Sequence, residues 1–216
     1  MKLFADRVEA GKRLAQALKG LVGEDAIVLA IPRGGVVVGY EVARALDLPL
    51  DVIIPRKIGA PDNPELAIGA TTEDGTVLLD EMLVEQLRVS AAYIQQESEA
   101  QKKEIQRRLS LYRGDVPYPS LENRAVILVD DGIATGSTMK AALASVRNRQ
   151  AKSVIIAIPV GPPATIRELE EKADHVVCLQ TPEAFYAIGQ FYEDFAQTRD
   201  EEVTELLKLI REQRGD

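Results

Sequence analysis

Short, uninterrupted apolar runs alternate with amphipathic stretches along most of the chain. The runs are typical of strands buried on both faces of a parallel sheet, and they lie at 26–31, 50–54, 125–129, 153–158 and 175–179. Apolar residues at helical spacing separate the runs. They predict helices at about 6–20, 36–46 and 137–148, a helix that begins near Pro163, and two tail helices near 183–190 and over 201–211. This alternation indicates an α/β fold with a mostly parallel, Rossmann-like sheet flanked by helices.

The stretch between the second and third runs has a different texture. From Arg56 to Asp80, Gly, Pro, Asn and Asp interrupt two short apolar pieces at 66–70 and 77–79, which predicts an irregular flap or hairpin. Residues 81–113 look helical but unusually polar, with only a thin apolar line, so we expect a half-exposed helix.

The length of 216 residues suits one well-buried domain with an appended flap. We expect a single domain over 1–216. Its core spans about 21–60 and 122–182, a lid and helical insertion span about 58–120, and a helical tail spans about 183–216.

Charge and cysteine content narrow the possible partners and location. The net charge of -8 disfavours nucleic acid. Cys178 is the only cysteine, which excludes an internal disulfide and fits a reducing compartment. Asp6, Arg7 and Glu9 interrupt any apolar leader, and Asp6 with Glu9 has the spacing of a capping box. No apolar run is long enough to cross a bilayer, so we expect a cytoplasmic protein without membrane contact.

The segment from Val126 to Thr138 carries the chemistry. An apolar strand ends in Asp130 and Asp131, continues into a loop rich in Gly, Ser and Thr, and opens a helix. The carboxyl ends of strands in open α/β sheets face the ligand crevice, so both acids are delivered to a site. Gly132 and Gly136 allow backbone angles that expose amide hydrogens. These amides, together with the neighbouring hydroxyls and the helix N-terminus, predict a phosphate-binding loop.

Two carboxylates beside a phosphate cradle favour a ligand that has hydroxyl groups and a phosphate at one end. Carboxylates accept strong charge-assisted hydrogen bonds from vicinal hydroxyls, so a sugar 5-phosphate meets the requirement. Other phosphate motifs fit worse. A Walker loop needs Lys where Ser137 stands, and no GxGxxG fingerprint is present.

The segment ValAspAsp followed by AlaThrGlySerThr resembles the phosphoribosyl-pyrophosphate (PRPP) motif of type I phosphoribosyltransferases, most of all their adenine and orotate branches. The motif-bearing resemblance covers about 26–60 and 124–180. The whole chain is also similar to uncharacterised phosphoribosyltransferase-like proteins that share the LeuValAspAspGlyIleAlaThrGly segment, a likeness that brings no substrate with it.

The resemblance implies roles for three sets of residues. The 5-phosphate is assigned to Gly132, Ile133, Ala134, Thr135, Gly136, Ser137 and Thr138. Asp130 and Asp131 are assigned to the ribose hydroxyls. The pyrophosphate is assigned to Arg33, Gly34, Gly35, Arg56 and Lys57. Asp130, Asp131, Arg33 and Lys57 are the expected catalytic residues.

Further family features follow from the resemblance. It implies Mg²⁺ held by PRPP and water, with no ligand residue directly assigned and Asp130 and Asp131 as candidates. It implies a mobile lid over 58–80, in which Glu65 is a candidate carboxylate without an assigned proton-transfer role. Arg33–Gly34 is the candidate for a non-proline cis peptide bond, and a homodimer is expected.

Several of these residues have plainer interpretations. Arg56 and Lys57 could be surface cations. A set of cations in the 81–113 stretch could reach a pyrophosphate or a neighbouring subunit, although a solvated helix face is favoured; it comprises Lys102, Lys103, Arg107, Arg108 and Arg113. The tail aromatics favour core packing, although one ring could face a ligand; they are Phe185, Tyr186, Phe191, Tyr192 and Phe195.

The predicted function is therefore transfer of a phosphoribosyl group from PRPP to a nitrogenous base or similar ring acceptor, with release of pyrophosphate. One alternative is a regulator that senses PRPP or a nucleotide without turnover. Another is a phosphohydrolase-like enzyme, which no His-rich cluster or nucleophile–base pair supports.

Overall fold

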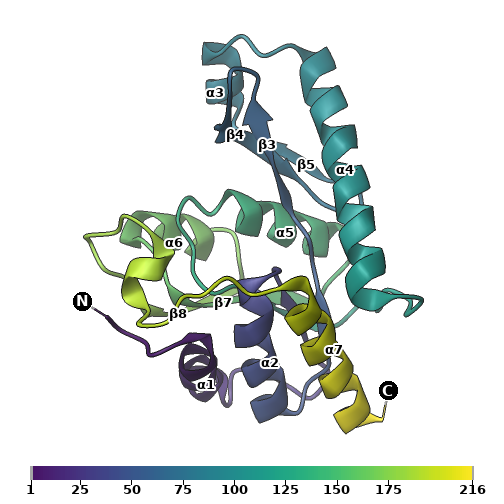
Figure 1. Cartoon of the computed structure of the whole chain (residues 1–216), viewed down its shortest axis with the longest axis vertical. Coiled ribbons are helices and arrows are strands. Elements are labelled where there is room, and N and C mark those ends of the chain that lie inside the picture. The colour runs from purple at the N-terminus through teal and green to yellow at the C-terminus, as the bar shows by residue number, and fades with distance from the viewer. Residues whose placement is uncertain (1, 216) are drawn as a thin grey trace.

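A computed structural model describes residues 2–215. A five-stranded parallel sheet forms the centre of the molecule, in the order β2-β1-β6-β7-β8 (Figure 1). Its strands are β1 (Ile27–Ala30), β2 (Leu50–Val52), β6 (Ala125–Val129), β7 (Ser153–Val160) and β8 (His175–Gln180). The strand order reverses direction between β1 and β6. The crevice at the carboxyl ends of these two strands is therefore the expected ligand site of the sheet.

The strands are continuous apolar runs because each of their faces is buried in a different core. Val28 and Ala30 of β1 pack with helices on one side, while Ile27 and Leu29 pack with helices on the other. Side chains of a strand alternate between faces, so a strand covered on both sides has no position for a polar residue. All five strands expected from the sequence are confirmed.

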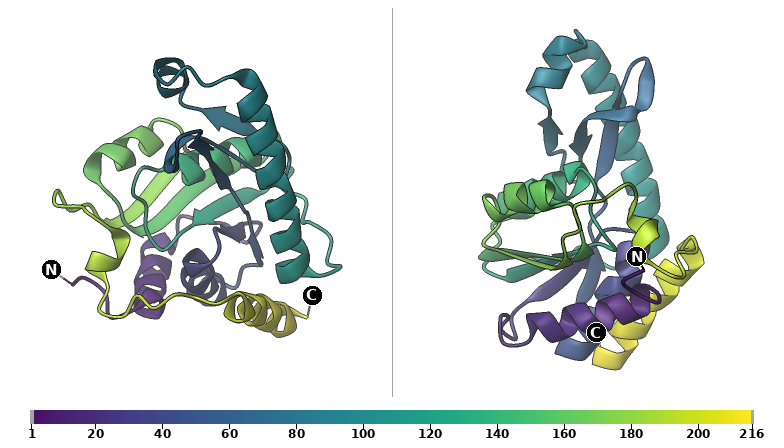
Figure 2. Two further views of the ribbon diagram at one scale, coloured as in Figure 1. Left: turned by 45° about the horizontal axis from the view of Figure 1, so that its top comes forward. Right: turned by 90° about the vertical axis from the view of Figure 1, so that its left-hand side faces the viewer.

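Helices cover both faces of the parallel sheet. One face carries α1 (Arg7–Leu18), α2 (Gly34–Leu46) and α7 (Asp200–Arg214), and the other carries α5 (Ser137–Asn148) and α6 (Pro163–Glu170) (Figure 2). Helix α1 begins as its capping pattern predicts, because the Asp6 carboxylate accepts a hydrogen bond from Glu9 N at 2.7 Å. The Glu9 carboxylate bonds back to Ala5 N, one residue before the cap.

Residues 56–113 form a separate layer that we call the hood. It contains an antiparallel sheet of β3 (Arg56–Ala60), β4 (Asn63–Thr71) and β5 (Val77–Leu79), followed by α3 (Glu81–Gln86) and the long helix α4 (Ala91–Arg113). The hood sheet rises from the end of β2, and α4 returns beside it to reach α7 (Figure 1). The expected flap is thus an ordered sheet with a small core, in which Ile58 and Ile68 are buried.

One helix prediction was confirmed in part, and another was wrong. The 81–113 stretch is broken at residues 87–90, where Arg88 takes a left-handed φ of 52° and Ser90 caps a new helix by accepting a hydrogen bond from Tyr93 N. Residues 183–190 do not form an α-helix. The tail instead pairs with the N-terminal segment, since Leu3 N and Phe4 N both donate to Phe191 O, and it contains one turn of 3-10 helix, η1 (Ile188–Phe191).

The tail helix expected over 201–211 is confirmed as α7. Between residues 2 and 215, no helix has the length and apolar character needed to span a membrane.

Candidate active site

The predicted phosphate loop follows β6 at the carboxyl edge of the parallel sheet. Gly136 has a left-handed φ of 74° and occupies the N-cap of α5, where it supplies no side-chain cap. The first amides of α5 therefore have no side-chain acceptor from the cap residue. Ala134 and Thr135 are exposed, and Thr135 Oγ1 lies 3.3 Å from Ser137 Oγ. The loop thus presents hydroxyls and a helix N-terminus to solvent, which suits an anion.

Neighbouring elements fix the shape of this loop from behind. Ile133 N donates to Val160 O at 2.9 Å, and Thr165 Oγ1 donates to Ala134 O at 2.8 Å. These bonds attach the loop to the end of β7 and to α6, so the loop is a preformed feature.

The two acids lie at the base of the crevice in different environments. The Asp130 carboxylate accepts a hydrogen bond from Asp131 N at 2.8 Å, and Asp131 Oδ2 accepts one from Arg7 Nε at 2.7 Å. Burial and the charge of Asp131 raise the pKa of Asp130 well above its usual range. Burial also raises the pKa of Asp131, and Arg7 opposes that shift.

Arg7 is a site residue that the sequence reasoning missed. Its guanidinium lies 3.8 Å from the centre of the Phe195 ring and donates to Ala196 O at 2.8 Å. Tyr192 OH donates to Asp131 O at 2.6 Å, so the tail and α1 meet at the same aspartate. A cation in the first turn of a helix interacts unfavourably with the helix dipole. This unfavourable position was the one signal in the sequence that Arg7 pairs with an acid outside its own helix.

The turn after β1 contacts the acid pair directly. A Cβ placed on Gly34 would lie 1.9 Å from Asp131 Oδ2 and 2.5 Å from Arg7 Nε, and one on Gly35 would lie 3.0 Å from the Asp130 Cα. Only glycine allows this approach. The cis peptide bond was misplaced by one residue: it joins Pro32 to Arg33. Gly34 is already the first residue of α2, whose regular helical geometry requires trans bonds.

The cations assigned to pyrophosphate each have a different protein partner. Arg33 Nη1 lies 3.9 Å from Asp200 Oδ1, and the hydroxyl of Tyr112 also bonds to that carboxylate. Arg56 Nε donates to Gln101 Oε1 of α4 at 2.9 Å, and Lys57 pairs with Glu65 Oε2 at 2.8 Å. No hydrogen bond or ion pair within residues 2–215 joins Arg56 or Lys57 to the phosphate loop.

Most cations of α4 lie on a solvated helix face, which is the interpretation that the sequence favoured. Lys102 pairs with Glu99, and both Arg107 and Arg108 pair with Glu104, all one helical turn apart. Glu104 has its pKa lowered to about 2 by these two guanidiniums. Arg113 is different, because it is buried beside Asp51.

The tail aromatics form a small core, as favoured from the sequence. Phe185, Phe191, Tyr192 and Phe195 pack together with Phe4. Tyr186 is outside this cluster and 90% exposed. It lies two residues before Ile188, whose side chain would be 2.6 Å from a Cβ on Gly132. Cys178 is half-buried against the core that contains α5 and α6.

A cavity of about 630 Å³ lies between the hood and α5. Gly69 and Leu79 of the hood line one wall, while Ser137 and Lys140 line the other. The hood therefore borders the end of the phosphate loop. Across the described part of the chain, no group of three or more His, Cys, Asp or Glu side chains is placed to hold a metal ion.

The strand order, the acid pair and the loop at the switch point together define a type I phosphoribosyltransferase fold. A family model for the phosphoribosyl transferase domain matches residues 5–196, and the chain belongs to this family.

Two proteins of Mycobacterium tuberculosis, from strains CDC 1551 and H37Rv, are each 45% identical over 207 residues and are both named "Putative phosphoribosyl transferase". The match covers 96% of this chain and 47% of each relative, so the chain spans about half the length of these relatives.

Two solved structures support the fold. The crystal structure of TT1426 from Thermus thermophilus is 42% identical with a TM-score of 0.82, covering 96% of this chain and 98% of that one. AQ2163 from Aquifex aeolicus, at 14% identity and a TM-score of 0.51, covers 85% of this chain and 76% of that one and shows the fold alone.

Proposed function

We propose that the protein is an active phosphoribosyltransferase that binds PRPP with Mg²⁺ and transfers the phosphoribosyl group to a ring nitrogen of a base or similar acceptor, releasing pyrophosphate. The observation that carries this proposal is that two segments suited to bind anions, the turn after β1 and the loop after β6, meet at Asp130 and Asp131. Gly34 and Gly35 lie against Asp131 and Asp130, which begin the phosphate loop. A ligand with an anion at each end and hydroxyls between them matches this arrangement.

The 5-phosphate end is assigned to residues 132–138. Main-chain amides at the start of α5 donate to the phosphate, and the helix dipole favours its charge. The hydroxyls of Thr135, Ser137 and Thr138 are the candidate side-chain donors. Because Ile133 and Ala134 are already bonded to β7 and α6, binding requires little reorganisation of the loop.

The ribose hydroxyls are assigned to Asp130 and Asp131. Hydrogen bonds donated to a carboxylate favour its ionised form. Binding therefore offsets the burial that raises the pKa of both acids in the free protein. Arg7 keeps Asp131 oriented toward the Gly34 turn while the sugar binds.

The pyrophosphate end is assigned to Arg33, Gly34 and Gly35, with Lys57 and Arg56 on the hood. Arg33 exchanges its long contact with Asp200 for the leaving group. The Lys57–Glu65 pair is exposed and therefore weak, so Lys57 is easily released when the β3–β4 hairpin closes. As the bond from C1 to oxygen lengthens, negative charge moves onto the pyrophosphate, and these donors stabilise it.

The residues at the site fit a magnesium ion that arrives with its substrate. Asp130 and Asp131 supply hard oxygen donors, but two carboxylates do not form a complete set for Mg²⁺, which keeps several waters and binds substrate phosphates. When bound, the ion would neutralise the clustered charge of the pyrophosphate.

The acceptor is assigned to the side of the crevice where the tail covers Gly132. Tyr186 is the candidate stacking ring, because its exposed face has no aromatic partner among residues 2–215, whereas the other tail aromatics pack together. A flat heterocycle would gain from stacking there. The homodimer and the cytoplasmic location stay predictions.

A pyrophosphate-release assay tests the proposal. The protein is mixed with PRPP, magnesium and a panel of purines, pyrimidines and other ring acceptors, and we expect release that depends on one of them. Asp130→Asn with Asp131→Asn should weaken PRPP binding by about 100-fold, because two charge-assisted hydrogen-bond acceptors are lost. Unchanged affinity in calorimetry would refute the assignment of the two acids.

One observation favours the alternative of a PRPP- or nucleotide-sensing protein. Arg7 donates to an oxygen of Asp131 and also to Ala196 O, so it connects this acid to the tail. Binding could therefore be signalled through the tail. Saturable PRPP binding without pyrophosphate release from any member of the panel would favour this sensor over the transferase.

A further inference from the structure

A second cavity, of about 400 Å³, lies at the amino edge of the parallel sheet, opposite the candidate active site. Its lining includes the first residue of β1, the start of β2, Arg124 just before β6, the 116–119 segment and the end of α7. The phosphate loop follows the other end of β6. The two sites are therefore separated by the length of the sheet.

Positive charge is in excess around this cavity. Three arginines, Arg124, Arg211 and Arg214, line it together with one carboxylate, Asp51. Arg214 pairs with Asp47, which is not part of the lining. Arg113 lies behind Asp51, with its Nε 3.1 Å from Asp51 Oδ1. The guanidinium of Arg124 donates to main-chain oxygens, at 3.1 Å from both Asp25 O and Ala26 O. The lining therefore contains more guanidiniums than carboxylates.

Two of these guanidiniums have donors without acceptors among the described residues. Arg113 is 8% exposed, and its Nη2 has no hydrogen-bond partner there; the buried Nη2 of Arg211 has none either. The Nε of Arg113 is at ion-pair distance from Asp51 but lacks hydrogen-bond geometry. Buried donors in native proteins almost always find an acceptor, and an unmet one is costly. The cluster is therefore suited to receive an anion.

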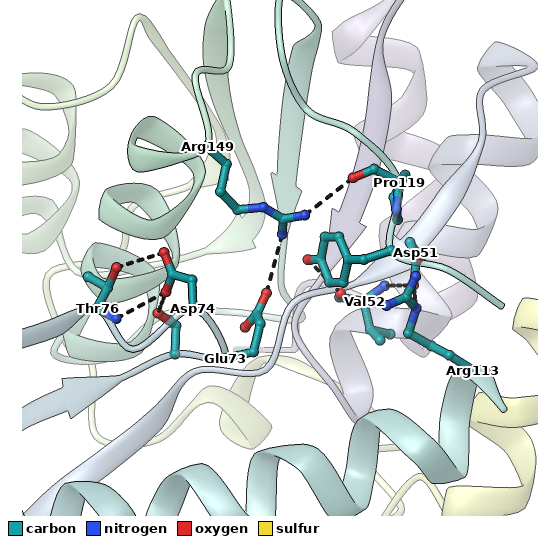
Figure 3. Close-up of polar contacts among 10 residues, drawn as sticks. Asp51, Val52, Glu73, Asp74, Thr76, Arg113, Pro119 and Arg149 are labelled. Atoms are coloured by element: carbon teal, nitrogen blue, oxygen red, sulfur yellow. Dashed lines mark hydrogen bonds and ion pairs between the residues drawn. The ribbon is translucent and has the colours of Figure 1, made fainter. Parts of the chain in front are cut away.

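The network around Arg113 holds it in place (Figure 3). Its guanidinium lies 4.3 Å from the centre of the Tyr118 ring, which also lies 3.6 Å from the guanidinium of Arg149. Tyr118 OH donates to Val52 O at 3.1 Å, and Arg149 reaches Glu73 of the hood at 3.5 Å. The guanidinium is thus preorganised.

The rest of the lining is apolar. Ile27, Leu50, Ile210, Val116, Pro117 and Pro119 surround the charged residues. A volume of about 400 Å³ lies within the range of small-molecule pockets, which combine apolar walls with a few convergent polar groups. The shape and chemistry therefore suit a ligand with an apolar ring as well as an anionic group.

We propose that this cavity binds a small phosphate-bearing molecule with a ring system, of the mononucleotide class. Guanidinium donors match the oxygens of a phosphate, and Arg211, whose buried Nη2 has no acceptor among the described residues, is placed to provide one, while Arg124 adds positive charge. The flat walls of Pro117 and Pro119 receive the ring. This inference does not depend on the proposed transferase activity, because it concerns the opposite edge of the sheet.

A fluorescence titration tests the proposal. The chain has no tryptophan, so a single introduced one reports on its own surroundings. Val116→Trp places a reporter in the cavity wall, and Tyr186→Trp places one near the candidate active site. We expect adenosine 5′-monophosphate to change the Val116→Trp signal with a saturable curve. Inorganic phosphate should compete, and adenosine without its phosphate should bind at least about tenfold more weakly.

Substitution of one arginine then identifies the site. Arg211→Gln, in the Val116→Trp background, should weaken the nucleotide response by about tenfold or more, while Arg107→Gln on the solvated face of α4 should leave it unchanged. Arg211 forms no ion pair with an acid inside residues 2–215, so the fold should survive, which circular dichroism checks. The proposal is overturned if only the Tyr186→Trp reporter responds, if adenosine binds as well as its monophosphate, or if Arg211→Gln binds normally.

Discussion

The two edges of the parallel sheet each bury an aspartate against an arginine, but they do so in different ways. At the carboxyl edge, Asp131 and Arg7 are joined by a 2.7 Å hydrogen bond, with side chains 13% and 11% exposed. At the amino edge, Asp51 and Arg113 are 3.1 Å apart, and both side chains are 7% exposed. The first pair lies beside main-chain amides, whereas the second lies beside further guanidiniums.

The comparison contrasts the two ways in which we propose that the edges bind an anion. In the proposed site, the loop binds phosphate through its backbone and the N-terminus of α5, which leaves the two acids for the sugar. The amino edge uses arginine side chains instead, with Asp51 balancing only part of their charge. Burial raises the pKa of Asp51 as well as that of Asp131, and in each case the nearby arginine opposes the shift.

The largest expected effect is the loss of the amino-edge pair. Arg113→Gln leaves Asp51 buried without its cation, and breaking a buried pair costs about 3 kcal/mol or more. Arg7→Gln breaks a more exposed pair, and we expect a loss of about half as much. Urea unfolding of the two variants measures the difference. A smaller loss for Arg113→Gln than for Arg7→Gln would contradict the contrast drawn between the two edges.

The next effect concerns activity at the carboxyl edge. Gly34→Ala pushes a methyl group into Asp131 and Arg7, which displaces the turn to which we assign the pyrophosphate. We expect the rate of pyrophosphate release to fall by about 100-fold, as when a preorganised donor is lost. Gly23→Ala is the matched control, since a Cβ there has no neighbour within 4 Å. Equal rates for the two variants would show that the Gly34 contact is not required.

Much of the core could be predicted because its signals are local. Burial on both faces forces uninterrupted apolar runs such as Ala125–Val129, and the phosphate loop is one contiguous segment. The partners of that loop were missed because they come from the chain's ends: Arg7 and Tyr192 carry no spacing signal that connects them to Asp131.

The hood and the tail show where local patterns mislead. The sequence predicted an irregular flap or hairpin over 56–80, but the exposed residues at 61–66 interrupt the apolar pattern, so the bounds of β3 and β4 could not be predicted. The segment predicted as a helix near 183–190 leads instead into one turn of 3-10 helix, and its aromatic residues pack with Phe4. In both regions, contacts between distant segments decide the structure, and these contacts have no counterpart in the local sequence.

The smallest expected effect is that of Asp130→Asn, which removes the charge of one acid at the carboxyl edge and leaves the shape of its side chain almost unchanged. In the folded protein, burial and Asp131 raise the pKa of Asp130, so the folded state holds this proton more tightly than the unfolded chain does. Wild-type stability should therefore fall as pH rises above the ordinary carboxyl pKa of about 4, until the raised pKa is passed. Asp130→Asn keeps the acceptor for Asp131 N and has no proton to lose.

We therefore expect Asp130→Asn to melt a few degrees above wild type near pH 8 and at the same temperature near pH 3, in a series of thermal melts. A lower melting temperature for Asp130→Asn at pH 8 would contradict the cause assigned to its pKa. A higher one, combined with weaker PRPP binding, would mean that the acid is kept for its ligand at a cost in stability, as is common at functional sites.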